Sequence, residues 1–555
     1  MAKTPPIRTV APTAKGDEID AGSPLPHRPP EPLGIPAPQP KFRPLKVYAF
    51  GPSRGGDRGN IQTLAVPYEK LAPGPVGARI AVVDYDTSNR CFYDPVDLDD
   101  PLIAMNAGLD PSESDPKFHQ QMVYAVVSET LHRIEVALGR TLRRRGPHGP
   151  EPLTLTVYPH YGVMANAAPE GNRIKLGYYQ APPAATNRIL PGQTVFSCLD
   201  QDSVSHTCAQ TVISAVRPDL DTDGHGFQAG LSLAIGDFTA LLFHFRNREL
   251  VFDTIQRTAG VIYQSQLVTH AAGDKPRISA ELTSDNPLLT LSPEFGDAFG
   301  RHGGLRNALM QQDAPAGVPA TDPYLRAGRV VAAIFDAMFS VYQRHTADLF
   351  RIHRAGGGRI DSDDLPEPLA LRLCDEVDRI ATRFFQMCWR ALDYCPPIST
   401  TIDDFLRACI TADYDYSPDD PWDLRDALTQ AFRIRGIVPK GVAFFSEDTL
   451  RWPTAEPDEW KRSALDPGRL QADPDAEIRA FVDDNKAALG ASAEAEVTIY
   501  PLEASRIVSE ADVPQLTWTT QVLTSDTNGR TLVFDDSGRL KYAIPSSPLP
   551  ALDPG

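Results

Sequence analysis

The chain has 555 residues, so it is too long for one small domain and is expected to fold as two or three. A hydrophobic content of 42% suffices for a buried core, while the net charge of -18 argues against sequence-independent binding of nucleic acid, which requires a basic surface. The seven cysteines include no CxxC pair, which favours reduced thiols. The N-terminal residues contain no apolar stretch typical of a signal peptide, and no run of about 18 apolar residues predicts a membrane span. These features predict a cytoplasmic protein with neither a nucleic-acid nor a membrane partner.

Residues 1–45 are rich in proline and contain few large apolar side chains, so we expect a disordered tail. Residues 46–200 carry β-branched and aromatic residues at short spacing between Gly, Pro and Asp, which predicts a β-rich N-terminal lobe. One long helix is predicted within this lobe, over residues 119–145, and its His119 is interpreted as a packing or surface residue. The strands are expected in KVYAF, ARIAVVDYD, LTLTVYPH and NRIKLGYY.

Residues 201–455 are predicted to be mostly helical, with clusters of Gly, Pro and Asp between the helices. The expected helices cover residues 203–215, 229–245, 247–264, 327–352, 366–391, 401–413 and 421–434. A helix over 474–490 follows, and then the strand candidates AEVTIYPL, LTWTTQVLT and RTLVFDDSGRLKYAIP, the last with DSG as a hairpin turn. We therefore expect a small α+β appendage over residues 470–545.

The stretch LDQDSVSHTCAQ (199–210) has the spacing of an incomplete zinc-peptidase helix. Such a helix presents two histidines four residues apart, with a glutamate beside the first as general base. Here His206 holds the first position, but Gln210 holds the second and Thr207 stands where the base is needed. Glutamine is a poor zinc ligand, and threonine cannot accept a proton at neutral pH. One histidine does not hold zinc against water, so we expect the zinc to be lost and the protein to carry no metal or cofactor.

Longer segments resemble the thermolysin-like metallopeptidases (gluzincins) and bacterial proteins related to them: LPGQTVFSCLDQDSVSH, AIGDFTALLFHF, and ALDYCPP with ITADYDYSPDDPWDLRDALTQAFRIRGI. The resemblance covers about residues 45–455. It implies an α+β fold with two lobes, β-rich and helical, and a cleft between them. It also implies that His206 matches the first zinc ligand, that Leu233 falls on the third ligand, and that Asp237 matches the carboxylate that binds the other ring nitrogen of the histidine.

Two further segments bear on the same site. DPYLRAG places Tyr324 where the relatives carry a histidine suited to stabilising an oxyanion. GVMANAAPEGN loosely matches the strand that binds peptide backbone in the family, which implies a peptide-binding edge at Asn166 and Ala167. Because the base, two ligands and this histidine are all replaced, our leading hypothesis is a catalytically inactive pseudo-peptidase that binds a peptide or protein in the cleft.

Other interpretations stay open. A hydrolase of altered chemistry in the same cleft would use Asp200, Asp202, His206 and Cys208. However, Cys208 lies two residues from His206 and so points to a different side of a helix, which favours a buried core thiol. An active metallopeptidase-type enzyme is another alternative, and a structural subunit paired with an active paralogue is a further one.

Overall fold

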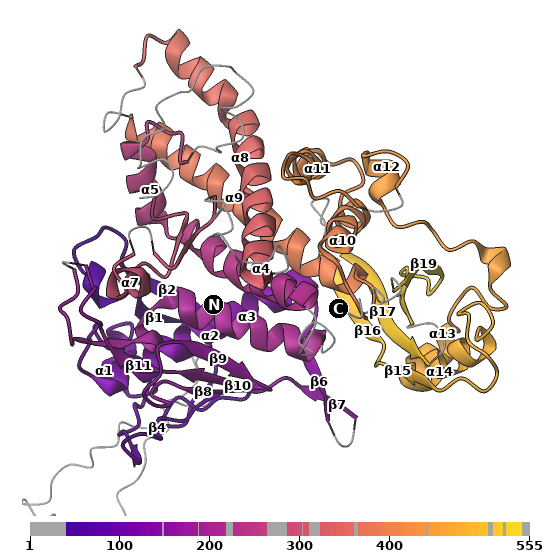
Figure 1. Cartoon of the computed structure of the whole chain (residues 1–555), viewed down its shortest axis with the longest axis horizontal. Coiled ribbons are helices and arrows are strands. Elements are labelled where there is room, and N and C mark those ends of the chain that lie inside the picture. The colour runs from indigo at the N-terminus through magenta and orange to yellow at the C-terminus, as the bar shows by residue number, and fades with distance from the viewer. Residues whose placement is uncertain are drawn as a thin grey trace, which may run out of the picture. The chain divides into compact units, whose positions relative to one another are not determined.

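A computed structural model of the chain describes residues 40–146, 149–186, 188–217, 226–263, 286–301, 304–309, 322–359, 365–439, 442–508, 514–525 and 529–546. The chain divides into two compact units, Met1–Lys41 and Phe42–Gly555. Most of the predicted proline-rich tail lies outside the described residues. The second unit combines helices with open sheets, so the α+β class predicted from the sequence is confirmed (Figure 1).

Strand β1 (Phe42–Tyr48) begins inside the segment that was predicted to be a tail, and it pairs antiparallel with β2 (Ile61–Pro67). Arg43 on β1 is buried, and its guanidinium is bonded to the Leu98 carbonyl and the Asp99 carboxylate. A buried charge needs such partners. The prediction was wrong at this boundary because the paired arginine lets β1 start three residues before Leu45, at Phe42.

A four-stranded sheet follows, in the order β3-β8-β10-β9. Its first three strands run parallel, and β9 pairs antiparallel at one edge. Their bounds are Ile80–Val82, Leu155–Tyr158, Arg173–Leu176 and Ala167–Glu170. Three small antiparallel pairs accompany the sheet: β4 (Tyr85–Asp86) with β5 (Cys91–Phe92), β6 (Arg143–Gly146) with β7 (Gly149–Pro152), and β11 (Tyr178–Gln180) with β12 (Thr194–Phe196).

The long helix of this region is α2 (Pro116–Leu138), which follows the short α1 (Pro101–Met105). Asp115 caps α2 by accepting a hydrogen bond from the Lys117 amide at 3.0 Å. The helix ends earlier than the predicted residue 145, because Gly139 adopts a left-handed conformation with φ of 67°. The arginines beyond it form β6 instead of a last helical turn.

The central part of the chain is helical, as predicted, and none of its described helices is long and apolar enough to cross a membrane. Helix α3 packs beside α4, α4 beside α8, and α8 beside α9, while α2 contacts both α3 and α9. The helices are α3 (Gln201–Val216), α4 (Gly226–His244), α5 (Arg248–Arg257), α7 (Pro293–Ala298), α8 (Pro323–Ala355), α9 (Glu367–Ala391), α10 (Ile402–Tyr416), α11 (Leu424–Ile434) and α12 (Glu447–Leu450). A short antiparallel pair, β13 (Thr290–Leu291) and β14 (Arg306–Asn307), lies next to α4.

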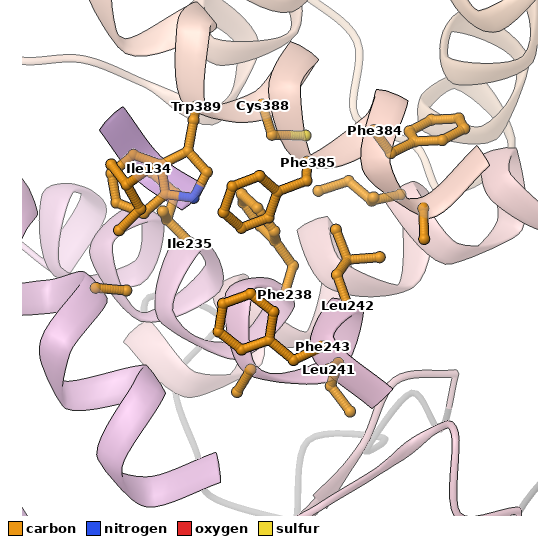
Figure 2. Packing of buried hydrophobic residues seen from close by; sticks show 14 of the residues in the cluster. Ile134, Ile235, Phe238, Leu241, Leu242, Phe243, Phe384, Phe385, Cys388 and Trp389 are labelled. Atoms are coloured by element: carbon orange, nitrogen blue, oxygen red, sulfur yellow. The ribbon is translucent and has the colours of Figure 1, made fainter. Parts of the chain in front are cut away.

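The core that fixes α4 against α9 combines aromatic and aliphatic side chains (Figure 2). Phe243 of α4 stacks on Phe385 of α9 with ring centroids 6.0 Å apart. The fully buried Trp389 of α9 donates its indole N–H to the Thr239 hydroxyl at 3.1 Å. A large aromatic side chain buried with its one polar atom satisfied adds strongly to stability, so this contact holds the orientation of α4.

The C-terminal residues form a sheet with its own apolar cluster, centred on Phe481, Phe534 and Leu532. Strand β17 (Pro514–Thr524) pairs with β15 (Val497–Ile499), β16 (Glu503–Val508) and β18 (Arg530–Phe534), and β18 pairs with β19 (Leu540–Pro545). The predicted hairpin turn at DSG is confirmed between β18 and β19, whereas β16 was not predicted. Two short helices, α13 (Pro467–Ala472) and α14 (Pro474–Asp484), accompany the sheet.

Candidate functional site

The candidate site is built on α3 and α4. Asp200 caps α3, where its carboxylate accepts hydrogen bonds from the Asp202 and Ser203 amides at 3.2 and 3.3 Å. This cap sets the start of the helix, and therefore the direction in which His206 leaves it. Residues four apart share one face of a helix, so His206 and Gln210 point the same way.

A buried ion pair joins the first turn of α3 to the last turn of α4. His244 Nε2 lies 2.7 Å from Asp202 Oδ1, and both side chains are almost fully buried. Burial alone would lower the pKa of His244, but the adjacent Asp202 carboxylate outweighs it and raises that pKa. The second oxygen of Asp202 accepts a hydrogen bond from the Ser292 amide at 2.8 Å. Because both partners are buried, the pair fixes the register of the two helices.

One turn further along α3, the ring of His206 lies against Gly236 and Asp237 of α4. A β-carbon at Gly236 would approach His206 Nδ1 to 2.7 Å, so only glycine permits this contact. His206 Nδ1 is 2.9 Å from Asp237 Oδ1. Nδ1 is nevertheless buried without a hydrogen-bond partner among the described residues, so the contact has ion-pair distance without hydrogen-bond geometry.

A second group, the Arg306 guanidinium, binds the same oxygen. Arg306 of β14 donates from Nη2 to Asp237 Oδ1 at 2.5 Å. Burial opposes ionisation of Asp237, but the Arg306 guanidinium and His206 outweigh it and hold the pKa of this carboxyl below its usual value. Sequence reasoning missed Arg306, because nothing in the local sequence links it to an acid 69 residues earlier.

Tyr324 reaches this cluster through Arg306. The Arg306 guanidinium lies 5.7 Å from the centre of the Tyr324 ring, within cation–π range. Tyr324 is in the first turn of α8, directly after the Asp322 cap, and is 55% exposed. The structure therefore brings together three of the positions singled out in the sequence: His206, Asp237 and Tyr324.

The other positions of the expected metal site carry no free ligand atom of the required kind. Thr207 is buried and donates its hydroxyl to the Ser203 carbonyl within α3 at 2.7 Å. Gln210 is half-buried on the His206 face. Leu233 is half-buried and packs against the main apolar core. Among the residues at these positions, only His206 offers a good zinc ligand.

The alternative catalytic set does not assemble around His206. Asp202 is bound to His244, and Asp200 is occupied as the cap of α3. Cys208 is fully buried, as expected for a core thiol, and burial raises the pKa of this thiol. A thiol in that environment is a poor nucleophile because the reactive form is the thiolate.

Asn166 and Ala167 lie at the open edge of the four-stranded sheet. Ala167 is the first residue of β9, which pairs only with β10 among the described strands. Asn166 is exposed, and α3 packs next to β9. An unpaired strand edge offers backbone hydrogen-bonding groups to an extended peptide. Pro169 within β9 lacks an N–H, which confines the open donors to the start of the strand.

A buried acidic residue that sequence reasoning also missed is Glu294 of α7. Its Oε1 accepts a hydrogen bond from the Ser53 amide at 3.3 Å, while Oε2 has no partner among the described residues. Burial, and then the charge of Asp200, raise the pKa of Glu294 to about 8. The same effects of burial and of Asp202 raise the pKa of Asp200 to about 7. Two buried carboxyl groups with raised pKa values therefore lie near the start of α3.

His119, interpreted from the sequence as a packing or surface residue, is buried in α2 and contacts a second buried histidine, His160, with 2.7 Å between their ring nitrogens. Burial and the neighbouring His160 lower the pKa of His119 to about 3. This contact lies outside the cluster around His206.

Comparison with models of known protein families finds no match for the chain, and comparison with curated proteins finds none either. The resemblance to gluzincins therefore stays a prediction from the sequence motifs.

The contact between His206 and Gly236 predicts a steric effect that depends on the histidine. Gly236→Ala should lower the free energy of unfolding by about 1–3 kcal/mol, because its methyl group overlaps the His206 ring. In a His206→Ala background the same change should be neutral or stabilise by up to about 1 kcal/mol, as expected for alanine in a helix. The matched control is Gly328→Ala in α8, where the added methyl group meets nothing within 4 Å. Urea unfolding of the four variants measures this; equal costs in both backgrounds would refute the contact.

The raised pKa of Glu294 predicts a pH-dependent stability. The native chain binds this proton more tightly than the unfolded chain, so the free energy of unfolding should fall as pH rises from the ordinary glutamate pKa of 4.5 towards about 8. The slope from one such group is at most about 1.4 kcal/mol per pH unit. Glu294→Gln should flatten the decline, whereas Glu249→Gln, at an exposed acid of α5, should leave it unchanged. Unfolding curves across this pH range measure the difference, and identical declines in all three proteins would contradict a buried neutral Glu294.

Proposed function

We propose that the chain is a catalytically inactive metallopeptidase-like protein, a cytoplasmic pseudo-peptidase with the two-lobe arrangement of the gluzincins, that acts by binding a peptide or protein. The proposal depends mainly on one observation, which is the set of partners that bind the Asp237 carboxylate. In a zinc site this carboxylate would orient a ligand histidine, whereas here its oxygen is shared with the Arg306 guanidinium.

Arg306 counts against a metal ion at His206 on electrostatic grounds. Its guanidinium is permanently charged and lies, with His206, on the same oxygen of a buried acid. A divalent cation placed on the other side of the His206 ring would be repelled by this charge at short range, with little solvent to screen it. The replacement of the base by Thr207 and of two ligands by Gln210 and Leu233 acts in the same direction.

The strand edge supports binding as the remaining activity. The open edge of β9 begins at Ala167, beside the exposed Asn166, and β9 packs next to the helix that carries His206. A peptide added to this edge would gain backbone hydrogen bonds, and it would lie near α3 without needing any catalytic group. The partner proposed is therefore an extended peptide or an exposed strand of a protein.

Peptide binding is tested by selecting linear peptides from a random displayed library on the full chain. The best peptide should bind at least about tenfold more weakly, equivalent to about 1.4 kcal/mol, when alternate backbone amides are N-methylated, because the edge pairs with backbone. Asn166→Arg should weaken binding, whereas Asn106→Arg, at another exposed asparagine that follows α1, should not. Calorimetric titration gives these affinities; binding that is indifferent to N-methylation and to Asn166 would refute the proposed edge.

Restoring the ligands tests the proposed relation to gluzincins. The variant Thr207→Glu, Gln210→His, Leu233→Glu and Arg306→Ala should take up about one more zinc ion per chain than wild type, because three ligands then surround one point without the Arg306 charge beside it. His206→Ala in wild type should leave the zinc content unchanged, and wild type should not hydrolyse casein with or without added zinc. Zinc that wild type loses on His206→Ala, or casein hydrolysis by wild type, would show that the proposed inactive site is wrong.

A further inference from the structure

A second cluster of metal-binding side chains lies in the N-terminal part of the second unit. His119 comes from α2, His160 follows β8, and Cys198 lies in the helical turn Ser197–Leu199 that precedes α3. All three residues are buried, and a ring nitrogen of each histidine and the Cys198 sulfur lie within 4.8 Å of one another. Three segments far apart in the sequence thus converge on one point.

The outer nitrogen of each ring faces a hydrogen-bond acceptor. His160 Nδ1 lies 2.7 Å from Asp84 Oδ1, and His119 Nε2 lies 3.0 Å from the Glu113 carbonyl oxygen. The second oxygen of Asp84 is also occupied, since it accepts a hydrogen bond from the Gln120 side chain at 2.9 Å. A carbonyl oxygen and a carboxylate both require an N–H, so each outer nitrogen carries its ring's proton.

The inner nitrogens are then left with lone pairs that point at each other. His119 Nδ1 and His160 Nε2 are 2.7 Å apart. Two neutral imidazoles whose protons are on the outer nitrogens cannot hydrogen-bond to each other, so a cation must lie between them. That cation is either one additional proton or a metal ion. Metal-binding histidines characteristically donate their outer N–H to a carboxylate or a backbone carbonyl, as both rings do here.

We propose that His119 Nδ1, His160 Nε2 and Cys198 Sγ bind one zinc ion, at a site distinct from the His206 position. Tetrahedral zinc with bonds of 2.0–2.1 Å to nitrogen holds two such ligands about 3.3 Å apart. The two rings therefore separate by about 0.6 Å from their spacing in the proton-bridged form. Imidazole and thiolate together suit zinc better than calcium or magnesium, which take oxygen ligands.

Charge balance favours a divalent ion. A zinc ion, a Cys198 thiolate and the Asp84 carboxylate sum to zero, and so do the bridging proton and Asp84 in the metal-free form, where Cys198 is a neutral thiol. Neither form leaves a net charge in an interior where an unpaired one is costly. A monovalent metal would leave one uncompensated negative charge. Zinc binding releases two protons, one from between the rings and one from the thiol, and involves no change of oxidation state.

The surroundings suit a buried site with three protein ligands. The ring of Phe196 meets both histidine rings edge-on, at centroid distances of 4.9 and 5.6 Å, and Tyr93 lies 4.8 Å from His160. With ligands this deeply buried, the ion enters while the chain folds. It ties α2 and the end of β8 to the turn that leads into α3, and so supports the helix carrying His206. This inference does not depend on the proposed function.

The test is the zinc content of the full chain expressed in zinc-supplemented medium and then freed of loosely bound metal. Elemental analysis should find about one zinc ion per chain in wild type and in His206→Ala, falling at least about tenfold in Cys198→Ser and in His160→Gln. Cobalt-loaded wild type should show the absorption of a thiolate-to-cobalt charge transfer, a readout that needs no variant to fold.

Wild type with less than about a tenth of an equivalent of zinc, and no thiolate-to-cobalt absorption, would establish the shared proton and overturn the proposed zinc site. Zinc retained in a folded Cys198→Ser but lost in His206→Ala would also overturn it, and would place the metal at His206 instead. Loss of zinc from Cys198→Ser alone leaves the proposed function untouched, so the two proposals fail separately.

Discussion

The alignment of α3 with α4 depends on two His–Asp contacts. In the first the acid lies on α3 and the histidine on α4, and in the second the positions are exchanged. Asp202 of α3 pairs with His244 of α4, and His206 of α3 approaches Asp237 of α4. Asp202, His244 and Asp237 are buried and His206 is mostly buried, so sliding one helix past the other would break both contacts where an unpaired charge is costly. The aromatic packing of α4 on α9 then fixes this helix pair within the fold (Figure 2). The geometry around His206, on which the proposed function depends, requires this fixed alignment of α3 with α4.

With α3 and α4 aligned in this way, the charges around Asp237 favour the proposed binding role over catalysis. A peptidase needs His206 to be free to bind a metal ion, with Asp237 supporting it. Here Arg306 neutralises Asp237 and is itself covered by the Tyr324 ring. The negative charge of Asp237 is therefore met by Arg306 without a metal ion. The proposed zinc site at His119, His160 and Cys198 differs, because the lone pairs of two ring nitrogens face each other there and require a cation.

Local patterns in the sequence predicted most helices of the central region, strands β3, β8 and β10 of the four-stranded sheet, and the hairpin between β18 and β19, whereas β9 lies where a turn was predicted. Each of these depends on neighbouring residues, through capping, periodicity and turn chemistry. The end of α2 was misplaced because the left-handed Gly139 stops a pattern that basic residues would otherwise continue. Strand β16 was missed although it pairs with the next strand, β17, close to it in the sequence; only its contact with the Gly139 carbonyl is long-range.

The candidate site likewise combines positions that local sequence motifs indicated with a contact that only the fold brings together. Family spacing brought His206, Asp237 and Tyr324 to attention, and the structure places them in one cluster. Arg306 joins them from a short strand whose sequence gives no sign of the pairing. Likewise, His119, His160 and Cys198 converge only through the packing of α2 on the sheet and on the turn before α3.

The most direct test of the account is a crystal structure of the full chain grown with zinc, with anomalous scattering recorded at the zinc edge. The account predicts no anomalous peak within bonding distance of His206 and an Arg306 guanidinium bound to Asp237. A zinc peak on His206, with Arg306 displaced from Asp237, would contradict it.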